Sequence, residues 1–496
     1  WEKILMRMKM PKHLARTSMQ SSSNMSSLRG LFPFIKTYKG LIFAASIALI
    51  FTAALSLILP MAVRRVVDNF LMDDARIMDA HFGAALVISG LLAIGTALRY
   101  LIVTRLGERV VVDIRKVVFS RMIRMSPEFF ENILTGEVLS RINTDTTLVL
   151  TVIGSSVSIA LRNFLIFVGG LFLMLLTSAK LTGLVLLIVP LVLLPILTLG
   201  RKVRRLSKEN QDWIAASSAE ANEVLGAIQT VQAFTHEVQT QGSFANTIEN
   251  SYLSAYHRIN ARAFMTFIVI LFVFSGIIGV LWVGAHDVAA GALSAGMLVQ
   301  FVIYSVMVGG SVAALSEVWG ELQRAAGATE RLVELLEAED NLAETERPVS
   351  LPEPVAGNIS FDRVSFNYPS RQGSYALDNI TFEVKTGETI ALVGPSGAGK
   401  TTIIQMLLRF YDPNIGAVSF NGVDLRHMRR DDFRKSISLV PQDPAIFANS
   451  VIENIRFGRP DASDKDVIAA AKKAAAHEFI SDLPQMYESH VGERGI

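Results

Sequence analysis

One segment of the sequence has the residue types and the spacing of a phosphate-binding loop. It consists of Gly394, Pro395, Ser396, Gly397, Ala398, Gly399, Lys400 and Thr401, which match the pattern G-x-x-x-x-G-K-[ST]. Glycines allow backbone N–H groups to face phosphate oxygens, and the start of a helix adds a favourable partial positive charge. We expect Lys400 to reach the β- and γ-phosphates of ATP, the Thr401 hydroxyl to ligate Mg²⁺, and Thr402 to belong to the ATP-binding set. The segment therefore predicts ATP and Mg²⁺ as cofactors.

The residues around this loop must join it to a strand on one side and to a helix on the other. The apolar run Thr389–Val393 precedes the loop and the helical pattern Lys400–Arg409 follows it, which is the order that phosphate binding requires. Further candidate strands are Ile359–Phe366, Ile380–Val384 and Ile437–Val440, and Asn421-Gly422 is typical of a hairpin turn. The pattern predicts an α/β P-loop domain over residues 357–496, preceded by an acidic, proline-bearing linker over residues 341–356.

The composition indicates that a large part of the chain does not face water. Of its 496 residues 51% are hydrophobic and 19% are charged, whereas soluble domains usually carry about 25% charged residues. A formal net charge of +2 excludes a strongly basic nucleic-acid binder, so nucleic acid is not an expected partner. The absence of cysteine excludes a disulfide scaffold, a thiol nucleophile and a cysteine zinc site. The eight histidines are scattered without the i, i+4 pairing of a helical metal site.

Six apolar stretches are long enough to cross a lipid bilayer, which takes about 20 largely apolar residues for about 30 Å of hydrocarbon. They cover residues 41–63, 82–104, 157–176, 181–200, 264–284 and 297–315. Basic residues collect before the first stretch, after the second and after the fourth, whereas Lys180 is the only basic residue in the turn after the third. Because Lys and Arg favour the cytoplasmic side, both termini are expected in the cytoplasm. The sequence thus predicts an all-α six-helix transmembrane domain over residues 31–340.

The two cytoplasmic connections, 105–156 and 201–263, are much longer than the external ones and carry helical periodicity. We therefore expect the spanning helices to extend well into the cytosol. At the tip of the first connection, Ser126-Pro127-Glu128 has the chemistry of a helix start and Thr135-Gly136 breaks the pattern, which predicts a short crosswise helix. A second short crosswise helix is expected over about Gln211–Ala219.

Two parts of this domain leave alternatives open. Arg99 and Arg162 lie near the cytosolic ends of the second and third stretches, where they could extend to the interface or meet an anionic group of a substrate in a polar cavity. Residues 1–30 contain a basic, serine-rich segment without the apolar core of a signal peptide. They predict a flexible basic arm, with an amphipathic membrane anchor as the alternative.

The chain resembles an exporter-type ABC half-transporter of the bacterial multidrug or lipid exporter kind, in which six spans are fused to an ATP-binding cassette. Tyr368 is similar to the aromatic residue of the family that stacks on adenine, and Gln442 is similar to its Q-loop glutamine, which contacts Mg²⁺ and the attacking water. The segment 491–495 resembles a loop that contacts the intracellular helices of the partner. Residues 126–145, 227–237, 291–296 and 324–336 resemble the intracellular loops, the last external turn and the exit helix of the family.

The sequence departs from the family pattern in one respect. Residues 357–496 lack the family's signature, the Walker B acidic strand with its general-base Glu, and the H-loop His. This cassette is therefore interpreted as partial, and the chain as C-terminally truncated. The resemblance implies that the general base lies beyond the C-terminus. We expect the complete protein to be an ATPase coupled to transport, and these residues alone to bind Mg-ATP weakly or not at all and not to hydrolyse it. A truncated parallel sheet is also expected to expose apolar edges.

The resemblance implies ATP-driven export by alternating access. Since one chain supplies six spans and one cassette, a second half-transporter is the expected partner, in a homodimer rather than a heterodimer. Few charges occur in the spans, which favours a small hydrophobic or amphipathic substrate such as a lipid or drug. The expected location is a multi-pass position in a bacterial inner membrane. The alternatives are one half of a heterodimeric exporter and an ATP-gated regulator on the same scaffold. The spans argue against a soluble GTPase or kinase, and the fusion argues against an importer.

Overall fold

The computed structural model describes residues 25–69, 75–340, 342, 345, 347–371 and 373–492, and these fall into two compact units. The helical unit contains the described residues up to Met125 and the range Ile133–Glu339. The cassette unit contains Ser126–Asn132 and the described residues from Asp340 onward. The helical unit contains the apolar stretches, and the cassette unit contains the phosphate-binding loop.

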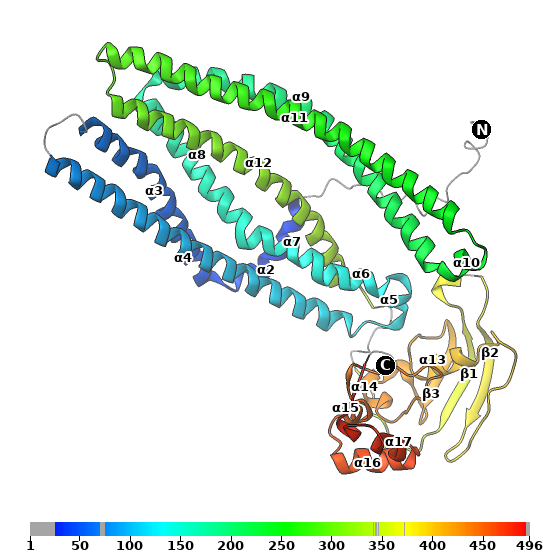
Figure 1. The fold of residues 1–496 in the computed structure, drawn as a ribbon. Coiled ribbons are helices and arrows are strands. Elements are labelled where there is room, and N and C mark those ends of the chain that lie inside the picture. The colour runs from blue at the N-terminus through cyan, green and yellow to red at the C-terminus, as the bar shows by residue number, and fades with distance from the viewer. Residues whose placement is uncertain are drawn as a thin grey trace. The chain divides into compact units, whose positions relative to one another are not determined.

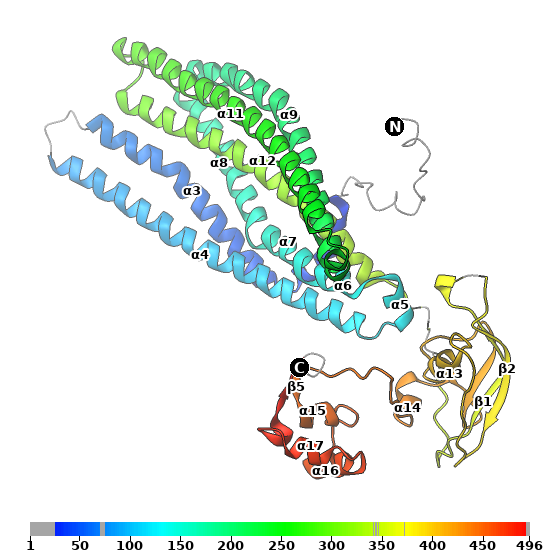
Figure 2. The same ribbon diagram turned by 45° about the vertical axis from the view of Figure 1, so that its right-hand side comes forward.

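The helical unit consists of long helices joined by short turns (Figure 1). The long helices are α3 (Lys39–Asn69), α4 (Ala75–Met122), α8 (Val157–Thr177), α9 (Ala179–Gly226), α11 (Glu237–Ala289) and α12 (Ala295–Glu337). The shorter elements are η2 (Met25–Leu31), α2 (Phe32–Lys36), α6 (Thr135–Ser140), η3 (Arg141–Asp145), α7 (Thr146–Thr151), η4 (Val152–Ser156) and α10 (Ile228–Ala233). In both ribbon views α9 lies beside α11, α3 beside α4 and α8 beside α12 (Figures 1 and 2).

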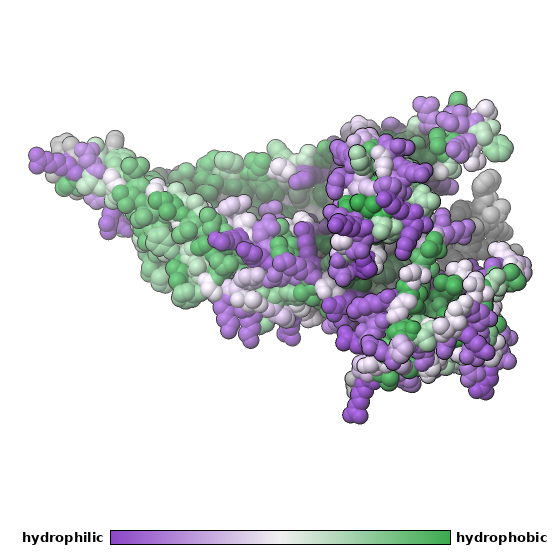
Figure 3. Space-filling view, turned by 90° about the horizontal axis from the view of Figure 1, so that it is seen from below, coloured by the Kyte–Doolittle hydropathy of each residue, from purple (hydrophilic) through white to green (hydrophobic). Residues whose placement is uncertain are grey.

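Six helices of this unit are long and apolar enough to cross a membrane, and each contains one of the six predicted stretches. They cover Lys39–Asn69, Arg76–Met122, Thr135–Thr177, Ala179–Gly226, Glu237–Ala289 and Ala295–Glu337. Large apolar side chains point outward along them, and Figure 3 shows a broad hydrophobic surface over this unit. Since water would penalise such a surface, it indicates contact with lipid. The prediction of a six-helix transmembrane domain is confirmed.

Two helix starts are fixed by serine caps. The Ser178 side chain accepts a hydrogen bond from the Leu181 N–H at the start of α9, and Ser294 accepts one from the Met297 N–H at the start of α12. Such caps satisfy N–H groups that the first helical turn leaves without a partner. Pro190 and Pro195 lie inside α9, which continues through both.

The helix between the first loop and α8 contains two wide turns. The segments η3 and η4 are π-helical, with α7 between them. Near η3, Arg331 of α12 donates two hydrogen bonds to the Asp145 carboxylate, at 2.9 and 2.6 Å. At η4, Ser156 donates a hydrogen bond to Glu321 of α12. The two wide turns therefore occur where polar side chains fasten this helix to α12.

The expected extensions beyond the apolar stretches are present in α4, in α9, in α11 and in the helical run Thr135–Thr177, but the second loop tip differs from the prediction. Gln211–Ala219 does not form a short crosswise helix, because these residues continue α9 to Gly226. No glycine or proline interrupts that segment, so nothing stops the helix. The short helix is instead α10, which follows Ala227. At the first tip, the helix break lies at residues 133–134, and Thr135 begins α6 instead of ending the pattern.

Part of the predicted flexible arm is ordered. Met25–Leu31 forms the 3₁₀-helix η2, and Leu31 is buried. A Cβ atom at Gly30 would lie 2.6 Å from the Val333 side chain of α12, so the glycine allows a close approach. Residues 1–24 of the arm lie outside the described residues.

The cassette unit is built on an antiparallel sheet with the strand order β2-β1-β3-β4. The strands are β1 (Ile359–Phe366), β2 (Leu377–Val384), β3 (Ile415–Phe420) and β4 (Val423–Asp424). Asn421 and Gly422 form the predicted hairpin turn between β3 and β4, both with positive φ, as a type I′ turn requires. The sheet packs on a buried apolar core that includes Phe361, Tyr411 and Phe433.

The remaining elements of this unit are short. They are α5 (Pro127–Asn132), η5 (Pro369–Arg371), α13 (Lys400–Leu407), η6 (Leu425–His427), α14 (Arg430–Arg434), β5 (Asn449–Ser450), α15 (Val451–Arg456), α16 (Asp464–Lys473), α17 (His477–Ser481), η7 (Met486–Glu488) and β6 (His490–Val491). The strands β5 and β6 form a separate two-stranded sheet. The helix α5 is the predicted crosswise helix at the tip of the first loop.

Two predicted strands are not strands. Thr389–Val393 and Ile437–Val440 have no strand pairing with any described residue. A strand needs a neighbouring strand to accept and donate its backbone hydrogen bonds, and neither segment has one here. Val393 and Val440 are 87% and 94% exposed, whereas Ile437 is half-buried and packs against the cassette core. The expectation of a truncated parallel sheet stays untested, since the described strand pairs are antiparallel.

Candidate functional site

The phosphate-binding loop has the backbone that its sequence predicts. Gly394, Gly397 and Gly399 have φ values of +155°, +84° and +85°, a region that favours glycine. A Cβ atom at Gly399 would lie 2.6 Å from the Ala376 carbonyl oxygen at the start of β2. The third glycine is therefore required both by its conformation and by the close approach of a neighbouring segment.

The helix α13 begins directly after this glycine, so its first N–H groups border the loop. The Lys400 ammonium donates hydrogen bonds to the carbonyl oxygens of Gly394 and Pro395, both at 2.8 Å. The ammonium is thus held over the loop itself. Thr401 is exposed, whereas Thr402 is 5% exposed and faces the interior. A glycine loop, a lysine over it and a hydroxyl at the helix start suit a triphosphate with its Mg²⁺.

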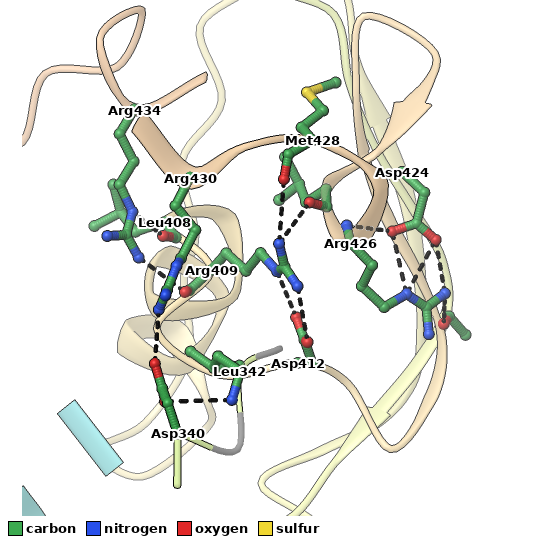
Figure 4. Close-up of polar contacts among 12 residues, drawn as sticks. Asp340, Leu342, Leu408, Arg409, Asp412, Asp424, Arg426, Met428, Arg430 and Arg434 are labelled. Carbon is green, nitrogen blue, oxygen red and sulfur yellow. Dashed lines mark hydrogen bonds and ion pairs between the residues drawn. The ribbon is translucent and has the colours of Figure 1, made fainter. Parts of the chain in front are cut away.

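The other end of α13 is held by arginines (Figure 4). Arg434 donates to the carbonyl oxygens of Leu408 and Arg409, both at 2.9 Å, where a cation stabilises the end of a helix. The Arg409 guanidinium is 2% exposed and donates to Asp412 at 2.9 Å and to the Leu425 carbonyl at 3.1 Å. These contacts fix the C-terminal end of α13. Because the phosphate loop precedes the N-terminus of α13, fixing the helix also holds the loop.

Asp424 and Arg426 form a second polar contact beside this frame (Figure 4). The two atoms Arg426 Nη2 and Asp424 Oδ2 lie 2.7 Å apart. Burial alone would raise the pKa of Asp424, but hydrogen bonds and the charge of Arg426 outweigh burial and lower it. Asp424 therefore remains a carboxylate at neutral pH and fixes the loop after β4.

Tyr368, the predicted adenine platform, lies between β1 and η5 with its hydroxyl directed at α13. The hydroxyl donates to Gln405 Oε1 at 2.6 Å and shares a hydrogen bond of 3.0 Å with Thr402 Oγ1. The ring is half-buried and meets Phe366 and Tyr411 edge to face. The structure therefore brings Tyr368 to the helix that follows the phosphate loop. Its stacking on adenine stays a prediction.

Gln442 is exposed and lies in an irregular segment. Among the described cassette residues, no hydrogen bond joins Gln442 to the phosphate loop, so its predicted contact with Mg²⁺ also stays a prediction. The predicted partner-contacting loop 491–495 is described only at Val491 and Gly492, and the remainder lies outside the described residues.

Sequence reasoning missed one contact at this site. Tyr411 is 2% exposed, and its hydroxyl donates a hydrogen bond to the Glu131 carboxylate of α5. Burial, followed by this hydrogen bond, raises the pKa of Tyr411. The two residues are 280 positions apart, and no local pattern could have paired them.

Two arginines of the helical unit, Arg99 and Arg162, lie within the predicted apolar stretches. Arg99 of α4 donates to the Ser158 hydroxyl of α8 at 2.6 Å. The charge of Arg162, also on α8, is close enough to act on Arg99. Both Nε atoms are buried, and neither has a hydrogen-bond partner within the described part of the chain. The choice between extension to the interface and contact with an anionic group of a substrate therefore stays a prediction for both arginines.

Comparisons with known proteins agree with both units. Residues 42–312 match the ABC transporter transmembrane region, and residues 377–494 match the ABC transporter family. The chain is 31% identical to ABC transporter B family member 1 of Dictyostelium discoideum, over 95% of this chain and 52% of that protein. It is 35% identical to the mitochondrial potassium channel ATP-binding subunit of Rattus norvegicus, over 82% of this chain and 57% of that protein.

A third relative is the putative export ATP-binding/permease protein of Rickettsia felis, which is 29% identical over 94% of this chain and 81% of that protein. The chain therefore spans about half the length of the Dictyostelium and rat proteins and most of the length of the rickettsial one.

Proposed function

The chain belongs to the ABC transporter family, and from this premise we propose that ATP binding at Gly394–Thr401 drives export of a substrate across a membrane. The observation that carries the proposal is a phosphate loop with a fixed lysine in the same chain as six spanning helices. ATP can drive transport only if its contacts with the cassette differ between two conformations of the membrane helices.

We assign the ATP contacts to residues of the loop and its neighbours. Lys400 binds the β- and γ-phosphates, Thr401 ligates Mg²⁺, and Thr402 holds the first turn of α13. Tyr368 stacks on the adenine, and Gln442 contacts Mg²⁺ and the attacking water. When bound, Mg²⁺ neutralises charge that develops on the phosphates. The positive φ angles and the lysine position support these assignments.

The functional unit in this proposal is a dimer that works by alternating access. Since one chain has six spans and one cassette, a second half-transporter must supply the other half, as a second copy or as a related chain. The crosswise helices transmit cassette closure to the spans. We place both termini in the cytoplasm from the distribution of basic residues. The short external loops lead us to place the protein in a bacterial inner membrane.

The proposed substrate is hydrophobic or amphipathic, of the lipid or drug class. A shallow, open depression of about 420 Å³ between α8 and α12 is lined mostly by apolar side chains, namely Phe167, Val312, Leu315 and Trp319, together with Ser316. Arg99 and Arg162 add a place for an anionic group.

The experiment is ATP-dependent uptake into sealed inside-out vesicles that carry the natural protein. A panel of anionic and neutral lipids and drugs is offered with and without ATP. We expect accumulation that Lys400→Ala abolishes and the matched exposed-lysine variant Lys435→Ala retains. Undiminished uptake by Lys400→Ala would contradict the proposal. A preference for anionic substrates that Arg162→Gln removes would support the substrate class.

A second candidate is an ATP-gated regulator, since one relative is named as the ATP-binding subunit of a potassium channel. The same vesicles distinguish the two candidates. ATP that changes ion conductance without accumulating any substrate favours the regulator.

Residues 1–496 by themselves contain no signature motif and no Walker B base. We propose that they bind Mg-ATP weakly at most and release no phosphate. Phosphate release that depends on Lys400, measured on a purified chain of these residues, would overturn this part.

A further inference from the structure

We propose that Glu131 and Tyr411 are positioning residues for the nucleotide site. In this proposal they hold Tyr368 and the first turns of α13, so that the loop helix α5 and the bound nucleotide affect each other. The inference rests on the proposed function, because it assigns to that same ATP site a route by which it is regulated.

The first contact of the route joins α5 to the cassette core. Tyr411 is almost fully buried, and its hydroxyl donates to the Glu131 carboxylate. Glu128, on the same helix, also acts electrostatically on Tyr411. A phenol that remains protonated beside two carboxylates is a permanent donor to α5, and a hydrogen bond to a charged acceptor is stronger than a neutral one.

The second contact is between aromatic rings. Tyr411, Phe366 and Tyr368 form a three-ring cluster, in which the Tyr411 and Tyr368 centroids lie 5.3 Å apart with an angle of 83° between their planes. Edge-to-face packing of this kind fixes the orientation of both rings. A shift of Tyr411 therefore moves the ring of Tyr368. The helix α5 also packs against η5, which begins directly after Tyr368.

The third contact reaches α13. The Tyr368 hydroxyl bonds Gln405 Oε1 at 2.6 Å and Thr402 Oγ1 at 3.0 Å. Thr402 is adjacent to Thr401 and two residues after Lys400, the residues assigned to Mg²⁺ and phosphate. The route thus runs from Glu131 through Tyr411 and Tyr368 to the start of α13.

The chemistry of the route goes beyond ordinary core packing. Phenylalanine would fill the apolar space of either tyrosine, and Phe366 does so in the same cluster. Both tyrosines use their hydroxyls, one toward α5 and the other toward α13. A buried hydroxyl is stable only when it is hydrogen-bonded, so loss of either contact changes the position of its ring.

Hydrogen exchange of the purified chain in lipid nanodiscs tests the route without nucleotide. We expect Glu131→Ala and Tyr411→Phe each to speed exchange of the amides of residues 400–405 about five-fold, the effect of losing one hydrogen bond. The double variant shows no further increase, because both changes break one path. Glu131→Gln, which keeps an acceptor oxygen, restores most of the protection.

The matched control is Tyr487→Phe, which removes a hydroxyl bonded to His477 Nδ1 at 2.9 Å elsewhere in the cassette. It should leave residues 400–405 unchanged. Unchanged exchange at 400–405 in Glu131→Ala and Tyr411→Phe, or additive effects in the double variant, would overturn the proposal. Glu131→Gln exchanging as fast as Glu131→Ala would also overturn it.

The reverse direction is tested with saturating ATP, since coupling between two sites is reciprocal. ATP should slow exchange of residues 127–132 in the unchanged chain and have no effect there in Tyr411→Phe or Tyr368→Phe. Displacement of trinitrophenyl-ATP monitors binding in parallel. If Lys400→Ala binds ATP as well as the unchanged chain does, the proposed function fails. In that case, and if no binding is detected, the nucleotide-free experiment alone decides the route. If ATP binds but leaves 127–132 unchanged, the route fails.

Discussion

Exposed apolar side chains occur in both units, and they differ in how they are arranged. Along α9 and α11 they form continuous outward surfaces, with Leu187 at 74% and Phe274 at 61% exposure. In the cassette the two most exposed apolar side chains, Val440 at 94% and Val393 at 87%, lie in short extended segments beside a well-buried core. Exposure alone therefore does not identify a lipid-facing surface.

The difference lies in the backbone. In α9 and α11 the helix satisfies its own hydrogen bonds, so only side chains meet the surroundings and lipid can cover them. At Thr389–Val393 and Ile437–Val440 no described strand pairs with the backbone. Lipid would leave these N–H and C=O groups without partners, whereas another strand or water would satisfy them.

The largest expected effect contrasts one substitution in the two regions. Phe433→Ala removes a fully buried ring from the cassette core and should lower its unfolding free energy by about 3–5 kcal/mol. Phe274→Ala removes an outward ring that faces lipid and should change stability by less than about 1 kcal/mol. Thermal unfolding in nanodiscs measures both. Equal losses would show that α11 is packed against protein and break the comparison.

For an introduced charge, we expect the larger loss in the helical unit and the smaller loss in the cassette. Leu187→Arg places a cation in the apolar part of α9 and should cost about 2.5–3.5 kcal/mol at the membrane centre. Val440→Arg, at a more exposed position, should leave cassette stability within about 0.5 kcal/mol. The membrane-inserted fraction and cassette unfolding provide the two measurements. Normal insertion of Leu187→Arg would place this surface in water.

Glycines sharpen the same contrast at a smaller scale. Gly399→Ala meets both a positive φ and a carbonyl oxygen at 2.6 Å, and should cost about 2 kcal/mol or more. Gly183→Ala lies in regular α9 with no atom within 4 Å of the new Cβ. It should stabilise the helix by up to about 1 kcal/mol. A neutral Gly399→Ala in a denaturation series would show that the loop can relax.

The smallest expected effect is the loss of stability at low pH that comes from the contact between Asp424 and Arg426. Because the folded-state pKa of Asp424 is lowered, its contact with Arg426 contributes stability above the ordinary aspartate pKa of about 3.9 and loses it as pH falls further. Arg426 is 40% exposed, so the contribution should stay below about 1 kcal/mol. Asp424→Asn should remove it at pH 7 and match the unchanged chain at low pH. A constant difference at all pH values would contradict this origin.

The parts predicted from the sequence are those encoded by neighbouring residues. The phosphate loop, the six helices and the hairpin at Asn421-Gly422 depend on spacing, length and turn chemistry, and all three have the expected form. Thr389–Val393 has the composition of a strand but lacks a strand partner among the described residues, and composition cannot provide one. The end of α9 depends on where a helix is interrupted, and Gln211–Ala219 contains no interruption.

The contact between Tyr411 and Glu131 and the proximity of Arg99 and Arg162 are tertiary. Each brings together residues from different elements, so no periodicity in the sequence reveals them. From the sequence, Arg99 and Arg162 could either extend to the membrane interface or meet an anionic group of a substrate. The structure adds that their Nε atoms are buried without a partner among the described residues, which only a structure can show.

The wide turn at Val152–Ser156 has a geometric consequence for the arginines that follow it. A π-turn carries one residue more than a regular turn of the same rise, and one residue corresponds to about 100° of rotation about a helix axis. Deleting a single residue within η4 would restore regular winding and swing Ser158 and Arg162 together away from Arg99. The direction in which Arg162 points relative to Arg99 is thus set by the extra residue in η4. A one-residue change in the length of η4 would rotate Arg162 away from Arg99 without altering either arginine.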